Sequence, residues 1–317
     1  MKISVIIPVY NKQDYLRGCL DSIRFQTHSD IQVVMVDDCS SDASVSICEE
    51  YVRMDPRFML EVHQQNKGQN GTIVDALKLA DGDWVAFVDS DDTLPHDALA
   101  HLASFTNDQT DIVVGFSFDW DGTHFTVPIQ DWRSSMIQSD VVLCTRWAKL
   151  YRRSILNEFN CSAPSGIKQG EDEIMNIKVA FETEKPVQVT RRKVYEYNRN
   201  ETSYSVTNRW TVEKFSQLYF AVQDCIPENE RANYAKELAQ NGIGMIRHII
   251  LRGARSEQRK LVSASFFKDV ASLVQANGLT LSRTDAIMMK RPSKLSTRFL
   301  VRSHRGAQII IKHILKH

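Results

Sequence analysis

The chain has 317 residues, enough for one full α/β core and a smaller second unit of roughly a hundred residues. Hydrophobic residues make up 43% and charged residues 25%, as in a folded soluble protein, which argues against a disordered chain. The 39 basic residues balance the 39 acidic ones, so the overall charge indicates no particular class of partner.

Neither the cysteines nor the apolar runs indicate a secreted or membrane-spanning protein. Six cysteines are scattered without a C-x-x-C pair or histidines at zinc-site spacing, so we expect reduced thiols in a cytosolic protein. The N-terminal apolar run at 3–9 is too short for a secretory signal and fits a buried strand. No segment approaches the roughly 20 apolar residues of a membrane span, so we expect that the chain does not cross a bilayer.

The first part of the chain alternates between predicted strands and helices. Apolar, largely β-branched runs predict strands at 3–9, 31–36, 58–62 and 84–88. Apolar residues at helical spacing predict the intervening helices; they are Leu16, Cys19, Leu20 and Ile23, then Val45, Cys48 and Val52, then Ile73, Leu77 and Ala80. We expect the third helix at 72–80. Such alternation predicts a doubly wound parallel sheet, which binds its ligand beyond the carboxyl ends of the strands.

The later part of the chain becomes mainly helical. The pattern is strand-like and irregular over 112–127, and a basic, aromatic stretch at 147–156 precedes a helix that begins near Glu171. We expect a catalytic domain at 1–205 and a helical region at 206–317. The apolar helix faces of that region are Phe215, Leu218, Tyr219 and Val222, and Ile243, Ile246 and Ile250.

An acidic turn follows the fourth predicted strand. Asp89-Ser90-Asp91-Asp92 comes directly after an apolar run, so its side chains would project from a rigid strand end into the ligand crevice. Carboxylates are hard ligands suited to Mg²⁺ or Mn²⁺, and such an ion keeps open positions for diphosphate oxygens. A solvated turn explains the same residues, since Asp and Ser are common turn formers.

Two further acidic segments have both a functional and a structural explanation. Asp38, at the end of the second strand, could accept hydrogen bonds from a base or a ribose, or the segment could form an Asx turn or a helix cap. Glu171, Asp172 and Glu173 fall on the first turn of a predicted helix. There one carboxylate could be a general base, or the acids could simply complement the helix dipole.

In chain order, these segments resemble the motifs of family 2 glycosyltransferases of the GT-A fold. The order is Ile6-Ile7-Pro8-Val9-Tyr10-Asn11, then Val36-Asp37-Asp38, then Phe87-Val88-Asp89-Ser90-Asp91-Asp92, then Glu171-Asp172. Four motifs at the family's separations make a specific match, and it extends to about residue 200. The resemblance implies an α/β, GT-A fold, with a mostly parallel, Rossmann-like sheet and a C-terminal helical extension.

The resemblance also implies roles for single residues. Asp38 would contact the uracil, Asp89 the ribose and the metal, and Asp91 the metal, while Asp172 would be the catalytic base. The donor-binding residues would be Pro8, Tyr10, Asn11, Asp38, Asn66, Lys67, Asp89, Ser90 and Arg199; the acceptor-binding residues would be Trp147, Lys149 and Glu171. The segment from Tyr197 through Arg199 to Ser205 looks like the family's loop that closes over the diphosphate.

Two departures from the family's pattern stand out. In the family, an N-x-G motif is commonly followed by A-R-N. This chain has the motif as Asn66-Lys67-Gly68, but no arginine follows it. The donor contacts of that arginine would be absent or supplied elsewhere, with Lys67 as a candidate. In the family's W-N-K-L-Y segment, Ala148 replaces the asparagine.

The resemblance implies a metal-dependent, inverting glycosyltransferase with Mn²⁺ or Mg²⁺. It would move a sugar from a UDP-sugar to a glycan or lipid-linked glycan, in the synthesis of a bacterial cell-surface polysaccharide such as a capsule or lipopolysaccharide. One alternative is a catalytically decayed glycan-binding or scaffold protein. Another is an NDP-sugar nucleotidyltransferase, which should carry a glycine-rich phosphate loop where this chain has Pro8-Val9-Tyr10-Asn11-Lys12.

The C-terminal tail is basic and amphipathic. After Asp285 there is no further acidic residue, and lysines and arginines alternate with apolar residues up to the end. This pattern predicts either a peripheral contact with the anionic inner face of the cell membrane or a C-terminal helix packed on the catalytic domain. The tail has too few aromatic residues to favour nucleic-acid binding.

Overall fold

A computed structural model describes residues 1–139, 143–198 and 210–290, with only the backbone of Thr284. Two compact units share the chain: Met1–Ile129 with Thr145–Ala163 and Glu182–Asn200, and Gln130–Cys144 with Pro164–Phe181 and Glu201–His317. Arg199, the predicted domain boundary at 205 and the basic tail beyond 290 lie outside the described residues, and what was predicted for them stays a prediction.

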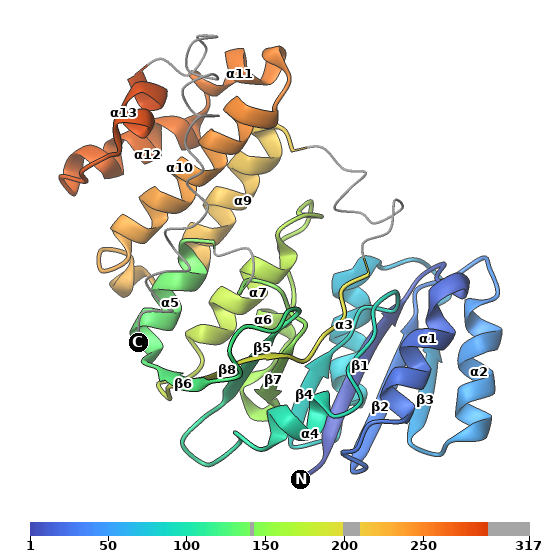
Figure 1. The fold of residues 1–317 in the computed structure, drawn as a ribbon. Helices are drawn as coiled ribbons and strands as arrows, with labels where there is room; N and C mark the ends of the chain where they lie inside the picture. Colours follow the sequence, from blue (N-terminus) through green and yellow to red (C-terminus); the bar gives the residue numbers. More distant parts are fainter. Residues whose placement is uncertain (140–142, 199–209, 291–317) are drawn as a thin grey trace. The chain divides into compact units, whose positions relative to one another are not determined.

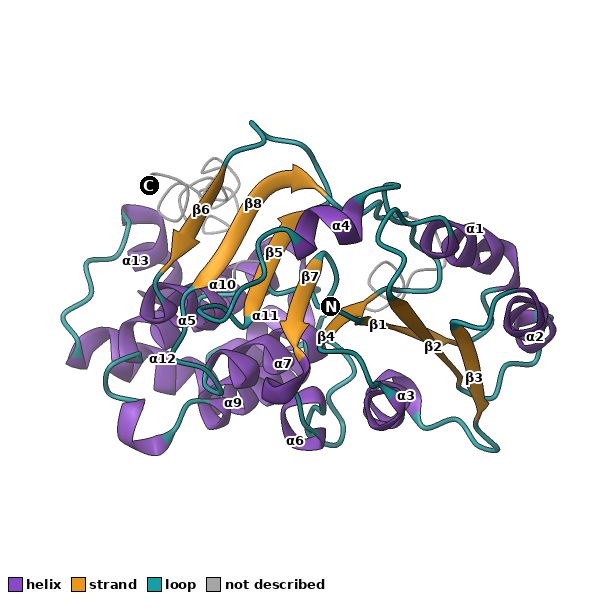
Figure 2. Cartoon of the chain, turned by 90° about the horizontal axis from the view of Figure 1, so that it is seen from below, coloured by secondary structure: helices purple, strands orange, loops and turns teal. Residues whose placement is uncertain are grey.

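The first unit is built on an eight-stranded sheet in the order β3-β2-β1-β4-β7-β5-β8-β6 (Figure 2). β1 pairs in parallel with β2 and β4, and β2 with β3; β7 runs antiparallel to β4 and β5, and β6 antiparallel to β8. The bounds are Ile3–Val9, Ile31–Asp37, Phe58–Val62, Trp84–Phe87, Ile112–Phe116, His124–Val127, Lys149–Arg152 and Val187–Lys193 for β1 to β8. The mostly parallel α/β sheet predicted from the sequence is thus confirmed.

Helices cover both faces of the parallel strands. α1 and α2 lie on one face of β1 to β3 and α3 on the other (Figure 2). The helices of this unit are α1 (Gln13–Arg24), α2 (Ser44–Met54), α3 (Gly68–Leu79), α4 (Ala98–Ala103) and α6 (Glu158–Cys161), with a 3-10 turn at Arg153–Ile155.

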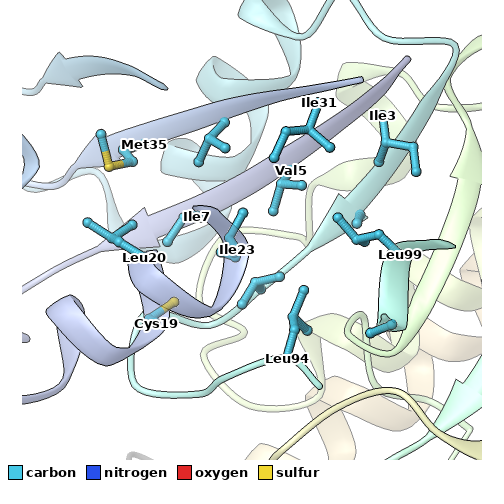
Figure 3. Close-up of a cluster of buried hydrophobic side chains, with 14 of the residues drawn as sticks. Ile3, Val5, Ile7, Cys19, Leu20, Ile23, Ile31, Met35, Leu94 and Leu99 are labelled. Carbon is cyan, nitrogen blue, oxygen red and sulfur yellow. The ribbon is translucent and has the colours of Figure 1, made fainter. Parts of the chain in front are cut away.

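The core of the first unit forms where α1 packs on β1. Val5 and Ile7 point toward Cys19, Leu20 and Ile23, and all five are fully buried (Figure 3). The alternate residue of β1, Ile6, is also fully buried, on the opposite face of the sheet. A strand covered on both faces needs apolar residues at successive positions, which explains the continuous β-branched run in the sequence.

The apolar face predicted for α2 is only partly buried. Cys48 is fully buried and Val45 partly buried, as expected, but Val52 is 37% exposed, and the helix buries Ile47 and Tyr51 beside Cys48. The Tyr51 hydroxyl donates to a carboxylate oxygen of Asp21 at 2.7 Å. This polar partner lets a tyrosine take the inward position, where a pattern based on aliphatic residues alone places the valine.

The second unit is helical. α7 packs against α9, and α10 against α9 and α12 (Figure 1). Both predicted apolar faces, on α9 and on α10, are buried and thereby confirmed. Its helices are α5 (Ile129–Ile137), α7 (Glu171–Ala180), α9 (Val212–Cys225), α10 (Ala235–Arg252), α11 (Arg255–Leu261), α12 (Ser265–Ala276) and α13 (Arg283–Lys290), with a 3-10 turn at Glu228–Glu230. No helix among the described residues is long and apolar enough to cross a membrane.

A buried carboxyl group joins two helices of this unit. Glu173 of α7 accepts a hydrogen bond at 2.8 Å from the side-chain amide of Asn241 on α10. Burial raises the pKa of Glu173 to about 7, while hydrogen bonds from Asn241 and Ser139 act in the opposite direction. Within the described part of the chain, Asn241 Oδ1 is buried without a hydrogen-bond partner.

Glu173→Gln should stabilise the protein at pH 8 and have a smaller effect at pH 5. Because its folded-state pKa is raised, Glu173 makes the wild type lose stability as pH rises from about 4.5 through about 7, and glutamine does not titrate. The new amide can also donate to Asn241 Oδ1. We expect chemical denaturation at pH 8 to show a free energy of unfolding roughly 1–3 kcal/mol higher in the variant than in the wild type. Exposed Glu213→Gln is the control; an equal effect of Glu173→Gln at both pH values would contradict this account.

Candidate active site

Three loops meet at the carboxyl edge of the parallel strands. The register pairs Val9 with Asp37, so β1 and β2 end side by side, and β4 ends next to β1 on its other side. The Asn11 N–H donates to Ser40 Oγ at 2.9 Å, and the Ser41 N–H donates to Asn11 Oδ1 at 2.8 Å. Pro8 is half-buried and Tyr10 is 50% exposed beside these bonds. The sheet therefore brings the predicted donor residues of the first two loops together.

Asp38 holds the start of α3. Its carboxylate accepts hydrogen bonds from the backbone N–H groups of Lys67 at 2.7 Å and Gly68 at 2.8 Å, and it lies 2.9 Å from His63 Nδ1. The Asn66 amide donates to the Asp38 carbonyl at 3.0 Å. Gly68 has φ +75°, which a residue with a Cβ rarely adopts. Asp38 thus caps α3 from a neighbouring strand and fixes the predicted donor residues Asn66 and Lys67.

The predicted start of α3 is corrected by this contact. The sequence pattern places the first helical residue at 72, whereas α3 begins at Gly68. Apolar periodicity starts only where the helix faces the core, and the cap comes from Asp38, far away in the chain. The local sequence therefore does not show where the helix begins.

Glu61, His63 and Asp75 bring their ligand atoms within 4.8 Å of one another, a spacing that could hold a metal ion. The Asp75 carboxylate already forms ion pairs with two ammonium groups, that of Lys67 at 2.6 Å from Oδ2 and that of Lys78 at 2.9 Å from Oδ1. These two hydrogen-bonded lysines, Lys67 first, lower the pKa of Asp75 to about 2. The cluster is therefore balanced by lysine charge, and His63 links it to Asp38.

The acidic turn divides its carboxylates between two tasks. Asp92 is buried, and it accepts hydrogen bonds from the Tyr195 hydroxyl and from the Asn198 N–H, both at 2.7 Å. Burial raises the pKa of Asp92 to about 6, and the two hydrogen bonds limit that rise. Asp89 and Asp91 remain partly exposed. Asp92 thus anchors the turn, and the other two acids keep part of their surface exposed.

Asp89 and Asp91 contact side chains from two other loops. Gln69, at the start of α3, donates to Asp89 Oδ1 at 3.3 Å. Lys12, which follows the first strand, places its ammonium 2.5 Å from Asp91 Oδ2. Ser90, between the two acids, is buried.

The donor set of the turn fits a divalent cation. Asp89 and Asp91 offer carboxylate oxygens at the end of a rigid strand, and a lysine ammonium already rests on one of them. Two protein carboxylates leave most of the coordination sphere of Mg²⁺ or Mn²⁺ to water and phosphate oxygens.

The predicted acceptor residues Trp147 and Lys149 differ in their exposure and in their contacts. The Trp147 ring stacks on Tyr195 with centroids 4.5 Å apart and on Tyr197 at 5.9 Å, and it is partly exposed. Lys149 is 2% exposed, and its ammonium donates to the carbonyl of Thr145. Because the Tyr195 hydroxyl bonds to Asp92, the tryptophan is tied to the acidic turn through one ring.

Glu171 and Asp172 occupy the first turn of α7 in the second unit. Both are partly exposed, whereas Glu173 points inward. The helix is preceded by Gly170 with φ +85°, and a Cβ there would lie 2.7 Å from Leu218. The left-handed backbone conformation therefore favours glycine immediately before α7, and a Cβ there would force the Leu218 side chain to shift.

Sequence analysis missed four residues that organise the site. They are Lys12, His63, Gln69 and Tyr195. Lys12 directly follows the predicted donor residue Asn11, and Gln69 lies in the segment that departs from the family's pattern. Their positions next to predicted site residues could therefore have identified them. His63 and Tyr195 act through partners distant in the chain, which no local pattern reveals.

Comparison with known proteins agrees with this geometry. The family model described as "Glycosyl transferase family 2" matches residues 4–164, half of the chain, and includes all three strand-end loops. The chain belongs to glycosyl transferase family 2. The protein is therefore a glycosyltransferase.

Similar proteins come from several bacteria. EpsH of Bacillus subtilis is 29% identical over 74% of this chain and 72% of its own length. The glycosyltransferase GlyA of Streptococcus pneumoniae is 34% identical over 66% of this chain, and a poly(ribitol-phosphate) beta-glucosyltransferase of Bacillus spizizenii is 32% identical over 58%. The matched region spans about a third of the length of these last two relatives, 32% and 30%.

A solved structure supports the fold. TarS 1-349 of Staphylococcus aureus, in complex with UDP-GlcNAc, superposes with a TM-score of 0.75 over 97% of this chain and 93% of that chain. The sequence identity is 23%. This chain therefore shares the fold of TarS 1-349.

Ala148, which replaces the family's asparagine, has φ +60°. Asparagine adopts this conformation more readily than alanine, and glycine adopts it without strain. Ala148→Gly should therefore raise the free energy of unfolding by about 0.5–1 kcal/mol, the relief of strain less the entropy cost of glycine. Ala76→Gly inside α3 is the control and should lower it by about 1 kcal/mol. Equal losses for both variants in chemical denaturation would refute the strain at Ala148.

Proposed function

We propose that this glycosyltransferase moves a sugar from a UDP-sugar to a hydroxyl of a glycan or lipid-linked glycan, in the synthesis of a bacterial cell-surface polysaccharide. The observation that carries the proposal is the pair of partly exposed carboxylates, Asp89 and Asp91, beside the loop that Asp38 organises. Support comes from the UDP-GlcNAc complex of TarS and from the poly(ribitol-phosphate) glycosyltransferase among the relatives.

Uridine recognition falls to the first two loops. Asp38 Oδ2 accepts one hydrogen bond from the described residues, from Gly68, and so keeps a lone pair for a base N–H. Tyr10 offers an exposed ring beside the loop for stacking on the base. Asn11, Asn66 and Ser90 complete the donor side. The exposed Lys67, whose ammonium pairs with Asp75 at 2.6 Å, is the residue proposed in place of the family's arginine.

Mn²⁺ or Mg²⁺ would be held by Asp89 and Asp91. When bound, the ion supplies stabilisation of the negative charge on the departing diphosphate. The turn keeps the two carboxylates in place because Tyr195 and Asn198 hold Asp92. A rigid turn costs little reorganisation when the donor arrives.

Asp172 would serve as the general base. The acceptor oxygen attacks the anomeric carbon as the bond from that carbon to the diphosphate breaks, and the acceptor proton passes to Asp172. UDP leaves, and a single displacement inverts the configuration at the anomeric carbon. Glu171, next to this base on α7, would orient the acceptor. In the first unit, the partly exposed Trp147 would stack on a sugar ring, and Lys149 donates to the Thr145 carbonyl in the same segment.

The remaining alternatives have less support. A decayed scaffold protein would still need Asp38 for the cap of α3, but that cap gives it no reason to keep the partly exposed carboxylates Asp89 and Asp91. A nucleotidyltransferase should carry a glycine-rich loop after β1, where this chain has Pro8-Val9-Tyr10-Asn11. Membrane contact through the basic tail stays a proposal that rests on its sequence pattern alone.

Asp172→Asn and Asp91→Asn should fail in different ways. Without its base, Asp172→Asn should lose about 10²–10⁴-fold in transfer rate and keep UDP affinity. Asp91→Asn should lose the part of UDP affinity that depends on Mn²⁺. Calorimetric UDP titrations with and without Mn²⁺, together with UDP release from the donor that the wild type uses, measure both effects. Exposed Asp224→Asn is the control, and wild-type transfer by Asp172→Asn would eliminate the base assignment.

A further inference from the structure

Lys12 connects the first loop to the acidic turn. Its ammonium lies 2.5 Å from Asp91 Oδ2, and the two side chains are only 24% and 14% exposed. Its backbone is fixed, because the Lys12 N–H donates to Ser44 Oγ at 2.9 Å and its carbonyl accepts from Leu16 at the start of α1. Only the side chain is left to move.

Lys12 and a metal ion compete for one carboxylate. A divalent ion binds a carboxylate oxygen at about 2.0–2.2 Å, so an ammonium at hydrogen-bond distance from the same group would lie close to it and repel it. Both side chains are largely shielded from water, so salt screens this repulsion less than at an exposed site. Metal binding at Asp91 is therefore favoured when the lysine moves away.

A nucleoside diphosphate would give the displaced ammonium a new partner. Lys12 belongs to the loop that carries Tyr10 and Asn11, the residues assigned to the nucleotide. Its four-carbon side chain can turn from Asp91 toward a phosphate oxygen while the backbone stays in place. Metal alone would cost the ammonium its pairing with Asp91, whereas a diphosphate bound with the metal would offer it phosphate oxygens instead.

We propose that Lys12 is the resident counter-ion of Asp91 and makes binding of the metal and of the nucleoside diphosphate cooperative. The proposal rests on the metal assignment made above. In the empty enzyme Lys12 neutralises Asp91 and keeps affinity for metal low. When the diphosphate arrives, Lys12 moves to its oxygens, and Asp91 is released to the ion. By linkage, each ligand then strengthens the other by the same factor.

A purely structural ion pair makes a different prediction. If Lys12 only stabilised the loop, its removal would lower the melting temperature and leave metal affinity unchanged. Lys12→Met keeps the length of the side chain and removes the charge, so it separates the two roles. Lys2→Met is the matched control, because Lys2 pairs with Asp81 at 2.7 Å on the surface of the same unit.

The test is a Mn²⁺ titration of the full chain, with free Mn²⁺ read by electron paramagnetic resonance, in the absence and presence of UDP. Without UDP, Lys12→Met should bind Mn²⁺ about tenfold more tightly than the wild type, while Lys2→Met should not differ. UDP should strengthen Mn²⁺ binding less in Lys12→Met than in the wild type. Circular dichroism confirms that each variant is folded.

Two results would overturn the proposal. In the first, Lys12→Met binds Mn²⁺ no more tightly than the wild type, or UDP strengthens both equally, while Asp91→Asn loses Mn²⁺ affinity; only the role of Lys12 then fails. In the second, Asp91→Asn keeps wild-type Mn²⁺ affinity. The metal assignment in the proposed function is then wrong as well.

Discussion

Parallel pairing of β1 with both β2 and β4 is the constraint on which the site depends. It places the carboxyl ends of three strands at one edge of the sheet, so that loops far apart in the chain come into contact. Val5, Ile6 and Ile7 bury β1 on both faces, and a shift of register would displace the packing on each side. The positions of Asn11, Asp38 and Asp89 follow from this pairing.

The carboxylates at this edge have different partners and so different tasks. Asp38 caps α3, and Asp92 binds Tyr195 and Asn198, so each has its hydrogen bonds inside the protein. Asp89 and Asp91 are partly exposed, and they are the two carboxylates proposed to hold the metal ion. The buried Asp92 fixes the turn that carries Asp89 and Asp91, and Lys12 forms an ion pair with Asp91.

Local sequence patterns predicted the parts of this arrangement that depend on burial and on motif order. The apolar run of β1 and the acidic turn after β4 are such parts, and so is Glu171 at the start of α7. Contacts between distant residues could not be predicted in this way. The apolar pattern predicted that α3 begins at 72, whereas the helix begins at Gly68, where Asp38 caps it. The inward position of Tyr51 likewise depends on its hydrogen bond to Asp21.

In the proposed function, Asp89 and Asp91 form the metal and diphosphate site of a UDP-sugar transferase. UDP release from a panel of UDP-sugars, measured with Mn²⁺ and again after chelation, tests it most directly. We expect release from at least one donor with Mn²⁺, loss of that release on chelation, and loss in Asp91→Asn with Mn²⁺ present. Release that survives both chelation and Asp91→Asn would contradict it.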